Sequence, residues 1–238
     1  MISTGFKALD RVIGGLKEGK LYALATFNFD HGTAEYFALN MIANIQRSAF
    51  FYFGLMESAQ MTASAFAGMS LFHVGDMDDD DSPAPPFPRG CLFSGRETAE
   101  SAEELCERFE TYHRNTPFEL AVFDIREMRA KDRARFASRL HETAHIVGLF
   151  RTLAEKHHIP VILLGRFDDW KSRTPPDDFL KPGDQLALLE TAENILLLSK
   201  AGAWRASDFD LTVFKHFLRP EKLPVYQYPR ETAAGNHA

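Results

Sequence analysis

Short apolar runs alternate along the chain with longer segments in which apolar residues recur every three or four positions. An unbroken apolar run is typical of a strand buried on both faces, and the helical spacing is typical of an amphipathic helix. The runs predict strands over residues 21–26, 49–55, 119–125, 160–165, 194–199 and 211–217. The spacing predicts helices over 34–47, 58–72, 101–114 and 144–157, with a further helical region in the basic stretch after residue 125.

This alternation predicts an α/β fold with a mostly parallel sheet and helices on both faces. We expect a single domain over residues 1–230, followed by a disordered tail over 231–238. Residues 75–90 form an acidic and proline-rich insertion, which we interpret as a solvated loop. The insertion lacks the alternating ligands and the terminal glutamate of an EF-hand, so a loop is favoured over a calcium site.

Composition and charge narrow the classes of function. The chain has 238 residues and a net charge of −6, which argues against broad binding to nucleic acid, because such binding relies on a basic surface. No apolar run approaches the ~20 residues that cross a bilayer, and the N-terminus has no signal-peptide pattern, so we expect a cytoplasmic protein without membrane contact. Cys91 and Cys106 are too far apart for a zinc site and are expected to be free thiols.

One segment of the chain is basic. We interpret it as a solvated helix face, interleaved with acidic residues, rather than as a nucleic-acid patch. Its cationic residues are Arg126, Arg129, Lys131, Arg133, Arg135 and Arg139.

Residues 21–45 have the layout of a phosphate-binding loop, with a strand, a short polar loop and an amphipathic helix. Such a loop carries a lysine that neutralises phosphate and a Ser/Thr hydroxyl that binds Mg²⁺. Ligands of parallel sheets bind beyond the carboxyl ends of the strands, and both this loop and Asp124 follow predicted strands. The loop itself contains no lysine and reads Asp30-His31-Gly32-Thr33-Ala34-Glu35.

Seven stretches of the chain carry recognisable motifs in a fixed order. The opening stretch, residues 2–25, is the most specific and reads ISTGFKALDRVIGGLKEGKLYALA. The later stretches are short but collinear: FALNMIANI, FFYFGLMES, LAVFDI, LAEKHHIPVILLGR, LALLETAENILLLSK and LTVFKHFLRPEK. Together they resemble the ATPase domain of DnaB-type replicative helicases over nearly the whole chain. The resemblance implies a RecA-like P-loop NTPase fold, and a start close to the first residue of that domain, without the family's N-terminal domain and linker helix.

The resemblance also locates the family's catalytic positions, and most of them have changed. The phosphate-loop lysine falls on Thr33 or Ala34, and the Mg²⁺-binding hydroxyl falls on Ala34 or Glu35. Glu57 lies one residue beyond the position of the catalytic base and is at most a vestigial base. Asp124 alone matches its counterpart, the Walker B aspartate, so the resemblance implies a degenerate Walker A motif beside a retained Walker B carboxylate.

The sensor and finger positions have changed as well. Arg166 stands where the family has a glutamine that senses the γ-phosphate. Lys215 matches the lysine of the late Lys-x-Arg pair, whereas Arg219 lies two residues beyond the position of the finger arginine. Catalysis by P-loop ATPases needs these groups together, because it consists of positioning and charge neutralisation.

Three functions are compatible with this pattern. The first, which we favour, is a catalytically degenerate DnaB-helicase-like protein that binds a partner without hydrolysing ATP and needs neither cofactor nor metal. The partner would be a DnaB-type helicase or another protein of DNA replication or of a mobile element.

The second function is an ATPase with a remodelled site. Asp124 would hold Mg²⁺, Glu57 would act as the base, and Lys215 or Arg166 would supply positive charge to ATP. The third is a DNA-binding accessory factor, with weak and salt-sensitive binding of single-stranded DNA. Its DNA-facing residues would lie in the loop after residue 166: Trp170, Lys171, Arg173 and Lys181.

Overall fold

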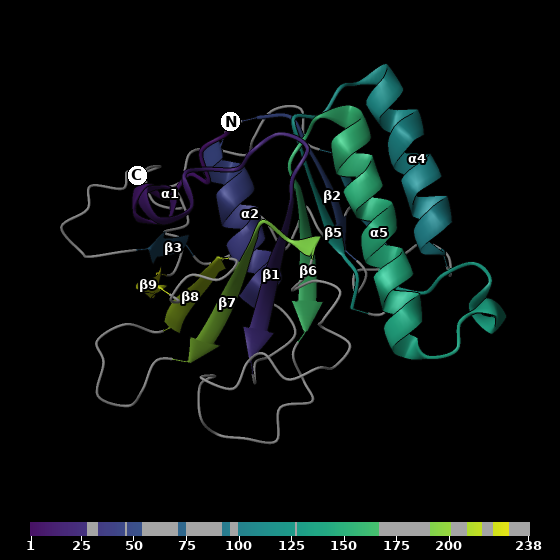
Figure 1. Ribbon diagram of the computed structural model, residues 1–238. Helices are drawn as coiled ribbons and strands as arrows, with labels where there is room; N and C mark the ends of the chain where they lie inside the picture. Colours follow the sequence, from purple (N-terminus) through teal and green to yellow (C-terminus); the bar gives the residue numbers. More distant parts are fainter. Residues whose placement is uncertain are drawn as a thin grey trace, which may run out of the picture.

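The computed structural model describes residues 1–27, 33–45, 47–53, 71–74, 92–95, 100–126, 128–166, 191–200, 209–215 and 221–228. These residues build one sheet and its covering helices (Figure 1). The predicted insertion at 75–90 and the predicted tail at 231–238 lie outside the described ranges.

The sheet has nine strands in the order β3-β9-β8-β7-β1-β6-β5-β2-β4. Their bounds in that order are Leu71–Val74, Glu221–Tyr228, Phe209–Lys215, Asn194–Lys200, Leu21–Phe27, Val161–Arg166, Leu120–Asp124, Ala49–Phe53 and Leu92–Gly95. The run from β7 to β4 is parallel throughout, and β8, β9 and β3 add antiparallel pairs at one side. The expectation of a mostly parallel sheet is confirmed.

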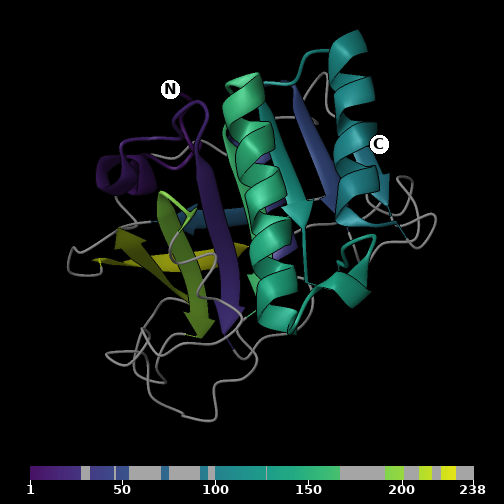
Figure 2. The same ribbon diagram turned by 45° about the vertical axis from the view of Figure 1, so that its right-hand side comes forward.

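Helices cover both faces of the sheet, as the alternation of elements predicts. Helices α1 (Lys7–Ile13) and α2 (Thr33–Ile45) pack with Leu24 and its same-face neighbours into one hydrophobic core. Helices α4 (Ala102–Asn115) and α5 (Arg139–His157) pack with Ala23 and its neighbours into the second core. Consecutive residues of β1 enter opposite cores because successive side chains of a strand point to opposite faces. Figure 2 shows α5 in front of the central strands, with α4 beside it.

Local sequence signals explain where the helices start and stop. Ser101 accepts a hydrogen bond from the Glu104 backbone N–H, while the Glu104 side chain accepts one from the Ser101 backbone N–H, which forms a capping box at the start of α4. Ser138 caps α5 through the His141 backbone N–H. Helix α1 ends at Gly14, whose φ of 75° lies in the left-handed region that glycine adopts without strain.

Most predicted elements are present, with shifted bounds. The predicted helix at 144–157 begins at Arg139, and the basic stretch before it is mainly irregular, with only a short 3₁₀ turn, η1 (Arg133–Arg135). A helix does not form there because the backbone of Arg129 pairs with the start of α4, where the Ala102 N–H donates to the Arg129 carbonyl at 2.8 Å.

The later part of the chain holds further differences. Of the predicted helix at 58–72, residues 58–70 lie outside the described ranges and the last two residues belong to β3, so its predicted end is wrong. The predicted strand at 211–217 begins two residues earlier, as β8. The sequence analysis did not identify α1, β4 and β9. Among the helices that the structure describes, none is long and apolar enough to cross a membrane.

Candidate functional site

The candidate site lies at the carboxyl edge of the parallel strands. Strands β1 and β5 both run parallel to β6, so their carboxyl ends meet at one edge of the sheet. Asp124 is the last residue of β5, and Glu35 lies in the first turn of α2, the helix that follows β1. The fold therefore brings two carboxylates from distant parts of the chain to the edge where parallel sheets bind ligands.

Arg126 joins these two carboxylates. Its Nε donates to Asp124 Oδ1 at 2.8 Å and its Nη2 donates to Asp124 Oδ2 at 2.7 Å, which is the bidentate geometry of a strong arginine–carboxylate pair. Nη2 of Arg126 also donates to Glu35 Oε1. Only 4% of the Arg126 side chain, 1% of the Asp124 side chain and 4% of the Glu35 side chain are exposed. We refer to these three residues as the buried triad.

The buried triad carries one cation and two anions. Burial opposes the charge on Arg126, but hydrogen bonds and the charges of Asp124 and Glu35 outweigh it and raise the pKa of the guanidinium. Burial raises the pKa of the Glu35 carboxyl, and the nearby Arg126 only partly offsets this effect. Glu35 Oε2 is buried without a hydrogen-bond partner. The site therefore holds Asp124 firmly and Glu35 less favourably.

The residues of the buried triad do not fit a Mg²⁺–nucleotide. Magnesium needs carboxylate oxygens at about 2.0–2.1 Å, whereas both oxygens of Asp124 accept hydrogen bonds from Arg126. A phosphate at the start of α2 would meet the carboxylate of Glu35 in the first helical turn, where like charges repel. Within the described ranges, no group of three or more His, Cys, Asp or Glu side chains is arranged to hold a metal ion.

The other predicted site residues are distributed unevenly. Thr33 is half-buried and Ala34 buried at the start of α2, and the backbone of Arg166 ends β6 at the same edge, opposite Thr26 of β1. Lys215 ends β8 opposite Asn194, the first residue of β7, so its backbone lies at the opposite edge of the sheet. The remaining predicted residues fall outside the described ranges: Asp30, His31, Gly32, Glu57, Trp170, Lys171, Arg173, Lys181 and Arg219.

Sequence reasoning missed the role of Arg126. It treated this arginine as part of an exposed basic helix face, whereas the side chain is buried. The local signal was present, because an arginine two residues after a strand-terminal aspartate is close enough to pair with it. The remaining cations of that segment also form ion pairs, with Glu103, Glu104 and Glu142, rather than a purely solvated face.

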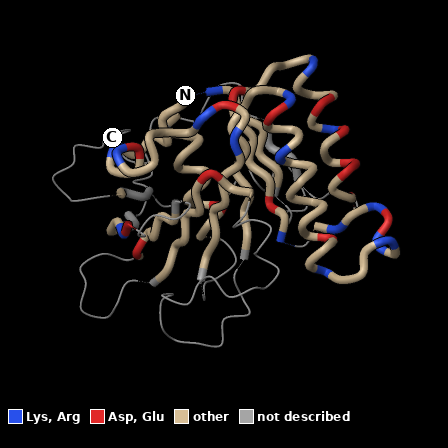
Figure 3. The backbone as a smooth tube through the Cα atoms, in the orientation of Figure 1, with Lys and Arg blue, Asp and Glu red and all other residues tan. Residues whose placement is uncertain are grey.

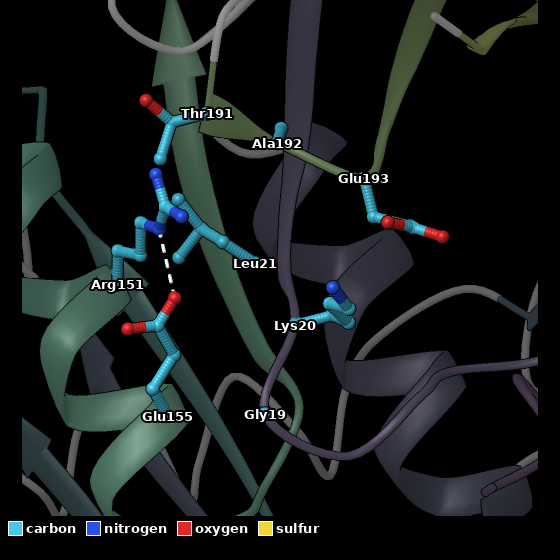
Figure 4. A pocket seen from close by; sticks show the side chains of 8 residues that line it. All are labelled: Gly19, Lys20, Leu21, Arg151, Glu155, Thr191, Ala192 and Glu193. Carbon is cyan, nitrogen blue, oxygen red and sulfur yellow. Dashed lines mark hydrogen bonds and ion pairs between the residues drawn. The ribbon is translucent and has the colours of Figure 1, made fainter.

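A small cavity lies at the opposite edge of the sheet, between the start of β1, the last turns of α5 and the residues before β7 (Figure 4). Arg151 and Glu155 line it and pair with each other at 2.9 Å. Its volume is about 120 Å³, well below the roughly 300–1,000 Å³ of ordinary small-molecule pockets. It therefore does not replace the carboxyl edge as a nucleotide site.

Cys106 is a free thiol, as expected, and burial raises its pKa to about 12. A thiol with so high a pKa is a poor nucleophile and a poor metal ligand at neutral pH. Cys91 lies outside the described ranges.

Comparison with known proteins supports the fold. No protein-family model matches the chain, and no curated protein matches it. Among solved structures 471 chains match. One of them is the ATPase domain of a DnaB-like helicase, with a TM-score of 0.65 and 16% sequence identity over 93% of this chain and 86% of that chain. The chain thus has a RecA-like α/β fold, which many proteins share and which does not by itself select a function.

Proposed function

We propose that this chain is a RecA-like protein that does not hydrolyse ATP and acts by binding a protein partner. The buried triad is the observation that carries the proposal. In a P-loop ATPase the strand-end aspartate serves the metal ion, and the first turn of the following helix serves the phosphates. Here Arg126 binds the aspartate, and Glu35 puts a negative charge in that first turn.

The energy of the buried triad supports the same proposal. Separating a buried ion pair costs about 3–5 kcal/mol. A Mg²⁺–nucleotide that needed Asp124 would have to supply this energy, which would weaken its binding by about two to four orders of magnitude. An ordinary nucleotide affinity in the micromolar range would then become negligible at cellular concentrations.

The alternatives receive less support. An ATPase with a remodelled site would use Asp124 for Mg²⁺, and that residue is already held by Arg126. For a DNA-binding accessory factor, the residues that would contact DNA lie outside the described ranges. No described contact favours either alternative over partner binding.

The class of partner follows from the resemblance rather than from the site. The sequence motifs resemble DnaB-type helicases, and the fold is similar to that of a solved ATPase domain from a DnaB-like helicase. A protein that keeps this fold without its chemistry retains surfaces that suit other RecA-like subunits or their associated factors. We therefore propose a cytoplasmic protein of DNA replication or of a mobile element, with a DnaB-type helicase as the first partner to test.

A thermal-shift titration with ATP and Mg²⁺, run beside a phosphate-release assay, tests the absence of nucleotide chemistry. A ligand at about a hundred times its Kd stabilises the folded state by roughly 2.7 kcal/mol, which is an easily measured shift. We expect no shift at millimolar ATP and no phosphate release. An active RecA-like ATPase serves as the positive control.

A Mg²⁺-dependent shift in the wild-type chain would overturn the proposal. The double variant Glu35→Gln/Arg126→Gln provides a second measurement, because it removes the charges of the buried triad around Asp124. If the triad blocks the site, this variant should bind Mg²⁺–ATP at least as well as the wild type does. Weaker binding by the variant would mean that Glu35 or Arg126 helps to bind nucleotide, contrary to the proposal.

A further inference from the structure

Three arginines surround one carboxylate at the start of α5. Arg139 Nη1 lies 2.8 Å from Glu142 Oε2, Arg129 Nη1 lies 3.8 Å from the same oxygen, and Arg133 Nε lies 3.7 Å from Oε1. We call Arg129, Arg133 and Arg139 the arginine cluster. It lies on the loop between β5 and α5, away from the buried triad.

The centre of the arginine cluster is fixed. Only 5% of the Glu142 side chain is exposed, and its Oε1 also accepts a hydrogen bond from the Ala130 N–H at 3.0 Å. Arg139 Nη2 donates to the Met128 carbonyl at 3.0 Å. Burial opposes the charge on Glu142, but the hydrogen bonds and nearby arginines outweigh it and lower the pKa of the carboxyl. Glu142 therefore stays ionised and anchors the loop.

One carboxylate cannot neutralise three guanidinium groups, so the arginine cluster keeps a surplus of positive charge. The surplus is accessible, because 41% of the Arg129 side chain and 63% of the Arg133 side chain are exposed. Their distances to Glu142 are too long for hydrogen bonds. Arginine forks in this state suit anionic groups that accept two hydrogen bonds at once.

An acidic surface borders the arginine cluster. Figure 3 shows red segments along α4 next to the blue segments of the loop that carries η1. Glu103 pairs with Arg135 at 3.3 Å, Glu104 pairs with Lys131 at 3.3 Å, and Glu107 is exposed one turn further along α4. The two surfaces together form a bipolar patch, positive on the loop and negative on the helix.

We propose that the arginine cluster docks a short acidic segment of a protein partner, whose basic residues then face α4. The proposal rests on the proposed function and names the surface and the chemistry of the partner. Charge complementarity sets the order of charges on the partner, because like charges facing each other across an interface are costly.

A nucleic acid fits this patch less well than an acidic peptide does. Its evenly charged backbone needs a continuous basic track, and here the carboxylates of α4 interrupt the track beside the loop. The net charge of −6 also repels a long polyanion at a distance. A short run of aspartate or glutamate meets only the arginine cluster.

A fluorescein-labelled oligoglutamate peptide is the probe, with binding followed by fluorescence anisotropy at low salt. We expect the peptide to bind the wild-type chain and the double variant Arg129→Glu/Arg133→Glu to bind it about tenfold more weakly or worse. The matched control is Arg47→Glu/Arg151→Glu, which makes the same change in net charge. The two control side chains are 55% and 57% exposed, and we expect this variant to bind nearly as the wild type does.

Four results would overturn the proposal. They are no binding at low salt, equal binding by the wild type and the cluster variant, equal loss in the control variant, and tighter binding of a single-stranded oligonucleotide than of the peptide. Melting curves establish that each variant is folded, and the milder single variant Arg133→Ala keeps the test decisive if the double variant is not. The ATP titration above is run on the same preparations. A Mg²⁺-dependent shift there would count against the proposed function, whereas the peptide result decides the docking surface alone.

Discussion

At the scale of single residues, the buried triad is the feature that distinguishes this chain from an active P-loop enzyme. Asp124 keeps the position that a metal-binding aspartate would have, but its two oxygens are bound by Arg126. Glu35 is held by the same guanidinium and has one oxygen without a partner. The site is therefore polar and internally paired, and Arg126 holds its two negative charges together.

Replacing Arg126 by methionine should destabilise the protein strongly. The change preserves most of the side-chain length but leaves two buried carboxylates without a cation, so the free energy of unfolding should fall by about 3–5 kcal/mol. Urea denaturation measures the change. Arg151→Met, at a 57% exposed side chain, should stay within about 0.5 kcal/mol of the wild type. Similar effects of the two variants would contradict the buried charge network.

Glu35 predicts a dependence of stability on pH. Burial raises its pKa in the folded state above the ordinary 4.5, so between these two values the folded chain binds a proton that the unfolded chain does not. The folded state therefore gains stability as the pH falls through this window. Relative to Glu35→Gln, which cannot titrate, the wild type should become more stable as the pH falls from about 8 to about 5.

Unfolding curves of the wild type and Glu35→Gln at several pH values measure this difference directly. Taking the difference between the two proteins cancels the contributions of the other titrating groups. A difference that stays constant over the whole range would show that Glu35 titrates in the folded chain as it does in the unfolded chain.

At the scale of elements, the helices on the α4–α5 face are set by polar caps as much as by apolar faces. The capping box of Ser101 and Glu104 starts α4, and the backbone of Arg129 pairs with this same corner. Ser138 and the arginine cluster around Glu142 fix the start of α5. These caps are why α5 begins five residues before its apolar pattern does.

Ser101→Ala should cost about 1 kcal/mol of unfolding free energy, because the helix loses the hydroxyl that accepts from the Glu104 N–H. Thr111→Ala lies in the same helix, where the exposed hydroxyl donates to the Glu107 carbonyl. This control should be neutral or slightly stabilising, because alanine is the better helix former. Chemical denaturation of both variants tests the cap, and a Ser101→Ala variant as stable as the wild type would count against it.

At the scale of the whole molecule, the central parallel strands form the most protected part of the sheet. Strand β1 lies between β6 and β7, and helices cover both of its faces. Among the described strands, β4 pairs only with β2, so it stands at one edge of the sheet. The two hydrophobic cores meet on the central strands, which should therefore unfold last.

Hydrogen exchange should reflect this arrangement. The amides of β1 and β6 should exchange only through global unfolding, with an exchange free energy equal to that from denaturation, whereas those of β4 should exchange through smaller local openings. Mass spectrometry of peptic fragments after exchange measures both. Exchange in β1 as fast as in β4 would show that the sheet does not open as one cooperative unit.

The sequence by itself determined the α/β class, the main strands, the parallel sheet and the carboxyl edge, because apolar periodicity is local and strongly constrained by the geometry of strands and helices. It missed β9, whose run Glu221–Tyr228 mixes charged residues and a proline into the apolar pattern. It identified Glu35 and Asp124 as site residues, but it assigned Arg126 to the surface. Only the tertiary structure decided that Arg126 pairs with a glutamate 91 residues away. Such a pair depends on which strand and helix ends the fold brings together, and no local pattern encodes that distance.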